Sequence, residues 1–301
     1  MAKDHIPAFI IHSNQLMMMN ESYLQAVMAI DKHDRIKYKE SMLKKISMLQ
    51  DNNNTIPLTT SYDSPDINPN SMAYYFVDGA ICAQDDYGRY FSSKGFEQDF
   101  LAAEQNDNIN VHFLHVSSGG GEGWYLDRLS ETLSNAQKPI YAMIERICGS
   151  AAYYIACHAD TLKALTQNDL IGCIGSMCKA YDISGMLEQM GIKELSLYAD
   201  QSDLKNKKYN DAMTGKPEQY ITEELNPMAQ QFIDEVRNSR SQLADLPDDD
   251  PILRGETFTA DVAVENGLID GIITLPEALI EAYQMGMDFS KKQSLCSMFN
   301  N

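Results

Sequence analysis

The chain has 301 residues, of which 44% are hydrophobic and 22% are charged, a balance that excludes a mostly disordered or collagen-like protein. A chain of this length buries a large core, so it needs no disulfide or metal site for stability. It has 24 Lys and Arg residues and 43 Asp and Glu residues, which gives a formal net charge of −19. A field of that sign repels phosphate groups and anionic lipids, which disfavours nucleic-acid and membrane-surface binding.

Targeting and metal-binding signals are missing from the sequence pattern. No stretch approaches the roughly 18 apolar residues that a membrane span requires, and the run at residues 9–11 is too short for a signal-peptide core. The six cysteines form no C-x-x-C pair and no cluster with zinc-ligand spacing. We therefore expect a soluble, cytoplasmic protein with reduced thiols, no metal site, no secretion signal and no transmembrane segment.

The composition divides the chain into four regions. Apolar residues recur at helical spacing from about residue 14, which predicts an N-terminal helical segment over residues 1–50. Residues 51–71 are rich in Asn, Asp, Ser and Pro, which is typical of a linker or a long surface loop. Residues 72–286 carry the pattern of the main domain, and we expect a loose polar tail over residues 287–301.

Strands and helices alternate along the main domain. The expected strands cover residues 73–77, 111–116, 139–144, 162–164 and 195–198. The expected helices cover residues 96–105, 124–136, 151–159, 183–190, 218–243, 260–266 and 276–285. This alternation predicts an α/β fold built of βαβ units, with a largely parallel sheet that is covered on both faces.

Two glycine-rich turns follow two of these strands, at the positions where parallel sheets bind ligands. The first covers residues 117–123, and its consecutive glycines, among them Gly119, let backbone N–H groups approach an oxyanion. The second carries Gly149 and Ser150 before a helix of small residues, which can present a serine hydroxyl at a helix N-terminus. Neither turn matches a nucleotide-binding fingerprint. Each alone is more often a tight turn or an N-cap, but together they indicate a nucleophile beside backbone donors.

A serine nucleophile needs a base. None of the six histidines follows position 158, where a Ser…Asp…His order requires one, so we interpret them as structural or surface residues. His112 and His115 point to opposite faces of one expected strand. The other route is a lysine kept neutral by burial. The segment after the expected strand at residues 195–198 offers three lysines, each of which alone is typical of a solvated loop: Lys205, Lys207 and Lys208.

Several motifs in a fixed order resemble the signal peptide peptidase A (protease IV) family of serine peptidases. That family includes phage capsid-maturation proteases and shares the Clp-protease/crotonase fold. The matching motifs lie at residues 117–120, 149–160, 171–175, 255–258 and 267–270. The resemblance implies a ClpP/crotonase-like spiral of βαβ units with an added N-terminal helical segment.

The resemblance also implies a Ser–Lys dyad. Ser150 matches the nucleophile of the family, and Lys205 matches the general base, with the two following lysines as lesser candidates. The backbone N–H groups of Gly119 and Ala151 match the oxyanion donors.

The sequence departs from the family pattern at two turns. In the first, Ser118 replaces a usual proline and an extra glycine leaves the register between Gly119 and Gly120 open. In the family's Gly-Ser-Ile-Gly loop, Cys173 stands where a serine helps to orient the lysine. A thiol is a weaker hydrogen-bond partner than a hydroxyl, so either Ser176 substitutes or the base is less well held. The membrane anchor common in the bacterial peptidases is not found, which favours the soluble phage-type branch.

Taken together, the resemblance implies a serine endopeptidase that needs no cofactor, cleaves a capsid-scaffold or assembly protein, and forms a homo-oligomer, with residues 218–243 as a contact. Two alternatives stay open. One is a catalytically silent assembly or scaffold module, which the departure at Cys173 makes plausible. The other is a crotonase-type acyl-CoA enzyme, which requires an acidic catalytic residue and a site for CoA phosphates that this acidic chain repels.

Overall fold

The computed structural model describes residues 17–19, 32–50, 56–85 and 88–299. Its central sheet has the strand order β11–β10–β8–β6–β3–β2, and every strand pair on this path is parallel except β10–β11. These strands are β2 (Leu58–Thr59), β3 (Ser71–Asp78), β6 (Ile109–Ser118), β8 (Ile140–Gly149), β10 (Leu170–Gly172) and β11 (Thr257–Thr259). Two more parallel pairs extend it, with β9 (Thr161–Ala164) beside β8 and β12 (Gly271–Ile272) beside β9. The expected α/β class with a largely parallel sheet is confirmed.

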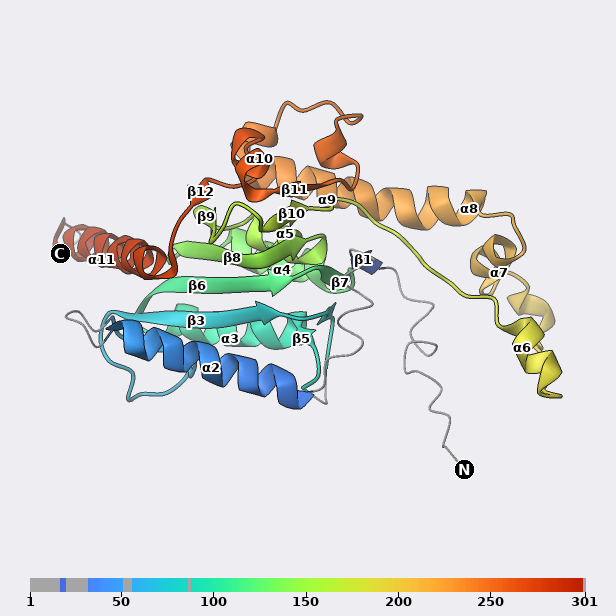
Figure 1. The fold of residues 1–301 in the computed structure, drawn as a ribbon, viewed down its shortest axis with the longest axis horizontal. Helices are drawn as coiled ribbons and strands as arrows, with labels where there is room; N and C mark the ends of the chain where they lie inside the picture. The colour runs from blue at the N-terminus through green and yellow to red at the C-terminus, as the bar shows by residue number, and fades with distance from the viewer. Residues whose placement is uncertain (1–16, 20–31, 51–55, 86–87, 300–301) are drawn as a thin grey trace.

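Helices lie on both faces of this sheet (Figure 1), and apolar residues between the helices and the sheet form two cores. Because side chains alternate along a strand, Tyr75 and Leu114 belong to one core while Tyr74 and Phe113 belong to the other. The first core is covered by α3 (Ser93–Gln105), α4 (Leu126–Ser134), α5 (Ala151–Ala156), α9 (Asn226–Ser239) and α10 (Ala260–Glu265). The second is covered by α2 (Lys32–Gln50) and α11 (Leu275–Phe299). Helices on both faces account for the continuous burial of β3 and β6.

A second, smaller sheet extends the carboxyl ends of β3 and β6. Its order is β1–β7–β4–β5, with β1 (Met17–Met19), β7 (Gly120–Glu122), β4 (Ile81–Cys82) and β5 (Phe91–Ser92). The helix expected from about residue 14 is therefore wrong at residues 17–19, which form a strand, and correct over residues 32–50. The rest of that segment lies outside the described residues. Methionine suits either structure, and here backbone pairing with the glycine-rich β7 decides the outcome.

The segments expected to be a linker (residues 51–71) and a loose tail (residues 287–301) also differ from expectation. In the segment expected to be a linker or surface loop, Ile56, Tyr62 and Ile67 are buried, and the Tyr62 hydroxyl donates a 2.7 Å hydrogen bond to the Tyr74 carbonyl. The polar tail is helical rather than loose, since α11 continues to Phe299. No Gly or Pro follows position 286 to end that helix.

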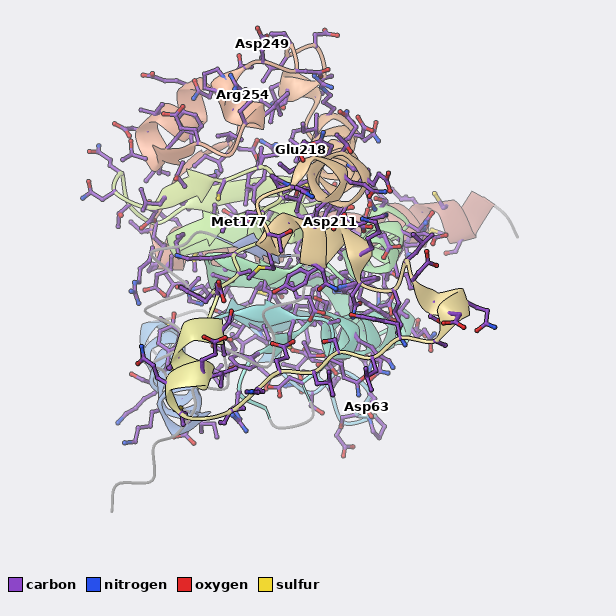
Figure 2. The ribbon with its side chains drawn as sticks, turned by 90° about the vertical axis from the view of Figure 1, so that its right-hand side faces the viewer. Asp63, Met177, Asp211, Glu218, Asp249 and Arg254 are labelled. Atoms are coloured by element: carbon purple, nitrogen blue, oxygen red, sulfur yellow. The ribbon has the colours of Figure 1, made fainter. Side chains whose placement is uncertain are left out.

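An arm leaves the main domain after β10 and returns through α9. It contains α6 (Ser184–Gln189), α7 (Lys207–Met213), α8 (Glu218–Tyr220) and a π-helical turn, Ile221–Leu225, that leads into α9. Figures 1 and 2 together show the arm beyond the carboxyl ends of the parallel strands. The strand expected at residues 195–198 does not form, and Leu195 and Leu197 are 77% and 82% exposed.

Candidate active site

The two glycine turns meet where β6, β8 and β10 end side by side. Ser118 pairs with Cys148, and Gly149 pairs with Gly172 on the other side of β8. A Cβ atom at Gly149 would lie 3.5 Å from the carbonyl oxygen of Gly119, so the two turns touch through their backbones. We call the residues 118–120, 149–151 and 172–173 the glycine corner.

Ser150 lies at the centre of the glycine corner in an uncommon backbone conformation. Its φ is 56° and its ψ is −123°, a region that favours glycine, and its N–H donates a 2.8 Å hydrogen bond to the Gly172 carbonyl. The side chain is 1% exposed, and its hydroxyl has no hydrogen-bond partner among the described residues. Strained backbone and an unsatisfied buried hydroxyl are both costly, and both concentrate at functional sites.

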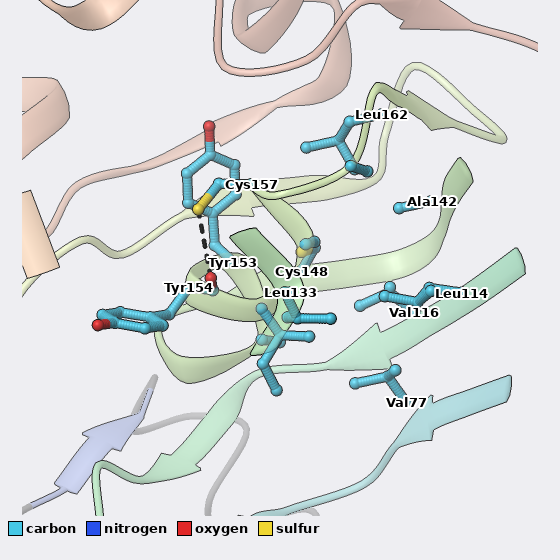
Figure 3. Packing of buried hydrophobic residues seen from close by; sticks show 14 of the residues in the cluster. Val77, Leu114, Val116, Leu133, Ala142, Cys148, Tyr153, Tyr154, Cys157 and Leu162 are labelled. Carbon is cyan, nitrogen blue, oxygen red and sulfur yellow. Dashed lines mark hydrogen bonds between the residues drawn. The ribbon is translucent and has the colours of Figure 1, made fainter. Parts of the chain in front are cut away.

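The helix that follows Ser150 is fixed by its own side chains. Tyr153 is fully buried, and its hydroxyl donates a 2.8 Å hydrogen bond to the Leu268 carbonyl. Figure 3 shows Tyr153 and Cys148 packed with the apolar residues of the first core. Ala151 is the first residue of α5, so its N–H has no acceptor within the helix. The two groups predicted from the sequence, the Ser150 hydroxyl and the Ala151 N–H, therefore lie at the start of a helix that is packed into the first core.

Contacts in the first turn bear on the register that the sequence left open. The Gly120 N–H donates a 3.1 Å hydrogen bond to the Ser118 hydroxyl, which itself donates a 2.6 Å bond to the Gly79 carbonyl. Since the Gly120 N–H is already engaged, Gly119 is the better candidate for an oxyanion donor. Ser118, the departure from the family's proline, holds this turn to the end of β3.

Cys173 and Ser176, the two candidates for orienting the base, lie in different surroundings. The Cys173 side chain reaches within 3.8 Å of a Cβ position at Gly149, and burial raises the pKa of its thiol. The thiol is therefore neutral beside the corner. The Ser176 hydroxyl donates a 2.6 Å hydrogen bond to the Leu225 carbonyl, where it ties the start of the arm to its return. Only Cys173 belongs to the glycine corner.

None of the three candidate lysines bonds to the Ser150 hydroxyl among the described residues. Lys205 is exposed just before α7, and Lys207 pairs with Asp211 one turn along that helix. Lys208 lies 2.8 Å from Glu223 and 2.6 Å from Glu224, and hydrogen bonds to these carboxylates raise the pKa of Lys208. This opposes the neutral amine that a general base requires. The assignment of the base to Lys205 stays a prediction.

A surface pocket that sequence reasoning missed joins the lysine segment to the first glycine turn. Its volume is about 360 Å³, and it is lined by Trp124, Leu204, Asn206, Lys207, Lys208, Tyr209, Tyr220 and Glu224. Trp124 directly follows the glycines and is 58% exposed. A tryptophan directly after a run of glycines is the sequence signal that could have indicated this surface.

The buried histidines are structural, as expected. The Tyr75 hydroxyl and Glu104 lie 3.0 Å and 2.8 Å from the two ring nitrogens of His112. On the opposite face of β6, Tyr74 and Glu145 bond His115 in the same way, at 2.8 Å and 2.9 Å. A neutral imidazole that accepts from the tyrosine and donates to the carboxylate satisfies every one of these contacts.

Comparison with known proteins decides the family. Residues 132–287, just over half of the chain, match the family model described as "Peptidase family S49". The chain belongs to peptidase family S49. The matched span of this S49 member contains Ser150 and Lys205, and membership supports a serine peptidase.

Two relatives carry peptidase names. A protein of Enterococcus faecium that bears the name signal peptide peptidase SppA is 24% identical over 216 residues, which are 67% of this chain and 60% of that protein. "Protease 4" of Haemophilus influenzae is 24% identical over 225 residues, 72% of this chain and 35% of that protein. The chain thus spans less than two thirds of the length of each of these relatives. Across residues 17–19, 32–50, 56–85 and 88–299, no helix has the length and apolar character to cross a bilayer.

Two solved structures with a similar fold are a Clp protease and an enoyl-CoA hydratase/isomerase. A ClpP1 mutant from Listeria monocytogenes aligns with a TM-score of 0.41 and 12% identity, over 68% of this chain and 94% of that one. An enoyl-CoA hydratase/isomerase from Marinobacter aquaeolei aligns with a TM-score of 0.38 and 12% identity, over 65% of each chain.

Proposed function

We propose that this S49 member is a serine endopeptidase in which Ser150 is the nucleophile. The observation that carries the proposal is the glycine corner itself. A buried serine at positive φ ends a parallel strand, with the Gly119 turn on one side and the start of α5 on the other. In the proposed site, Ser150 supplies the hydroxyl, and the backbone N–H groups of Gly119 and Ala151 supply the two donors that acyl transfer requires.

In the proposed mechanism, the neutral amine of Lys205 takes the Ser150 proton as the hydroxyl oxygen attacks a peptide carbonyl. The N–H groups of Gly119 and Ala151 stabilise the oxyanion of the tetrahedral intermediate. Lys205 then gives the proton to the leaving amine, and the acyl group stays on Ser150. Water, deprotonated by the same amine, releases the acyl group and restores the serine.

We propose that a second copy of the chain brings Lys205 to Ser150. The arm that carries Lys205 projects from the domain, and it exposes apolar side chains, foremost Leu195 and Leu197. A homo-oligomer that covers these side chains removes water from the arm, and burial lowers the pKa of a lysine. The long helix over residues 218–239 returns from the arm and is a further contact candidate.

The proposed substrate is a capsid-scaffold or assembly protein of a phage or prophage, cleaved in the host cytoplasm or the prohead. This part rests on the sequence resemblance to phage capsid-maturation proteases. Mass spectrometry of the purified protein and of co-expressed assembly proteins tests it, through truncation that depends on Ser150.

A fluorophosphonate probe tests the nucleophile directly. Ser93 provides the matched control, because its hydroxyl is also buried without a partner but lies at the start of α3, away from the glycine corner. We expect labelling of the wild type and of Ser93→Ala, and none of Ser150→Ala. Labelling that persists in Ser150→Ala refutes the assignment. No labelling of the wild type, with an intact oligomer, favours the silent scaffold module.

A further inference from the structure

The strand β1 lies along an edge of the glycine corner. Met17, Met18 and Met19 pair with Glu122, Gly121 and Gly120 in an antiparallel register. The paired strand β7 begins at the residue that follows Gly119. α5, which starts after Ser150, packs against β7 as well. A segment from near the N-terminus of the sequence thus lies beside the proposed oxyanion donor.

The strand β1 runs along β7 in the direction that a substrate peptide needs if its carboxyl side is to reach Ser150. From Met17 to Met19 the chain advances along β7 toward Gly119, and therefore toward Ser150. The carbonyl that a serine peptidase attacks lies at the carboxyl end of the residues bound along such an edge. The opposite strand direction would carry the peptide's carboxyl side away from the nucleophile.

The β7 edge favours recognition of a peptide main chain. Gly120 and Gly121 have no side chains, and a Cβ atom at Gly121 would lie 2.0 Å from the Ile81 carbonyl oxygen, so only glycine fits there. The Glu122 carboxylate accepts a 2.9 Å hydrogen bond from the Ala83 N–H, which fixes it to the neighbouring chain. An edge of this kind binds an extended peptide through backbone hydrogen bonds with little demand on its sequence.

We propose that the segment containing Met17–Met19 is an intramolecular occupant of the peptide-binding edge, and that it competes with substrate for β7. The inference rests on the proposed peptidase function for the statement that substrate binds at this edge. Because both partners belong to one chain, the effective concentration of β1 is of the order of millimolar. If β1 and a free peptide of the same sequence both bind β7 with a Kd of about 0.1 mM, the attached β1 raises the apparent Kd of the free peptide about tenfold.

A binding experiment that needs no catalysis tests the competition. The parent is Ser150→Ala, and the probe is a fluorescent synthetic peptide with the sequence of residues 12–24. Met17→Pro with Met18→Pro removes two consecutive backbone N–H groups, one of which faces β7 because these groups alternate along a strand. Met17→Ala with Met18→Ala keeps both N–H groups and is the matched control.

We expect the double-proline chain to bind the peptide about tenfold more tightly than the parent, and the double-alanine chain to bind like the parent. Equal affinity in all three chains, or no binding to the double-proline chain, overturns the competition. Circular dichroism checks that the variants fold. If the proline variant does not fold, deuterium uptake at residues 17–19 of the parent decides: slow uptake supports pairing of β1 with β7, and uptake as fast as that of the free peptide of residues 12–24 overturns it.

The failure of the proposed peptidase function and the failure of the proposed competition by β1 give different results. Loss of the peptidase function shows as absent fluorophosphonate labelling with Ser150 intact. Loss of the competition shows in peptide binding or deuterium uptake, both measured with Ser150 replaced.

Discussion

The N–H of Ser150 bonds the carbonyl of Gly172 at 2.8 Å, and this contact ties the candidate nucleophile to the next strand of the sheet. Gly172 and Cys173 both have positive φ as well, 120° and 57°, and the Cys173 N–H bonds the Glu256 carbonyl at 2.7 Å. Of these three residues, Ser150 and Cys173 carry a Cβ atom, so the surrounding strands hold two strained backbone positions at this corner.

Replacing Ser150 separates backbone strain from chemistry. A residue with a Cβ at positive φ costs about 1–2 kcal/mol, whereas glycine adopts this conformation freely. We expect Ser150→Gly to have a free energy of unfolding about 1 kcal/mol above that of Ser150→Ala, although neither variant is labelled by the probe. Urea unfolding of both measures the difference. Equal stability would show that the positive φ is not retained in solution.

Gly121 offers a test of the small sheet. A methyl group there overlaps the Ile81 carbonyl, so Gly121→Ala must separate β7 from β4. We expect a loss of about 1–3 kcal/mol in the free energy of unfolding, together with weaker labelling of Ser150. Gly185→Ala is the control, since a Cβ there meets no atom within 4 Å. A Gly121→Ala chain as stable and as reactive as this control would contradict the packing.

The lysine assignment is tested by three single substitutions. Lys205→Ala should lower turnover by about 10²-fold or more, as expected for loss of a general base, while Lys207→Ala and Lys208→Ala should keep most activity. Peptide turnover under identical oligomer concentrations measures this. A reversed order would move the role to another lysine.

Mixing two inactive chains tests whether the dyad forms between copies. Oligomers assembled from Ser150→Ala and Lys205→Ala chains should regain part of the activity, because some sites then combine an intact serine with an intact lysine. Each variant assembled alone is the control. If the mixture stays inactive while both chains co-assemble, the lysine acts within its own chain or has no role.

Acid should weaken the fold through His112. Burial lowers the pKa of His112 and outweighs the opposite effect of its bond to Glu104. The unfolded chain therefore takes up a proton near pH 6.5, and the folded chain does so only at lower pH. The free energy of unfolding should fall as pH drops below 6.5, by up to about 1.4 kcal/mol per pH unit from this residue. Urea unfolding at pH 7.5 and 5.5 should show a smaller change for His112→Gln than for the wild type. An equal change in both would contradict the assignment.

The sequence was most informative where a pattern is local. Short apolar runs rich in β-forming residues predicted β3, β6, β8 and β9, and helical spacing predicted the helices between them. The glycine before Ser150 indicated a turn at the end of β8, and it lies there. The turn expected over residues 117–123 is wrong at residues 120–122, which form strand β7. The short strands β4, β5 and β7 were missed, because two or three residues carry too little periodicity to be recognised.

The sequence by itself determined the parallel sheet and the serine at its carboxyl edge, since side-chain spacing and glycine placement act over neighbouring residues. Only the tertiary structure decided that Met17–Met19 pairs with β7 and that no lysine of the arm bonds the Ser150 hydroxyl among the described residues. The pairing of Met17–Met19 with β7 depends on backbone hydrogen bonds between segments that are far apart in the sequence. Every residue except proline has both a backbone N–H and a backbone C=O group that can form such bonds, so side-chain patterns do not predict which segments pair.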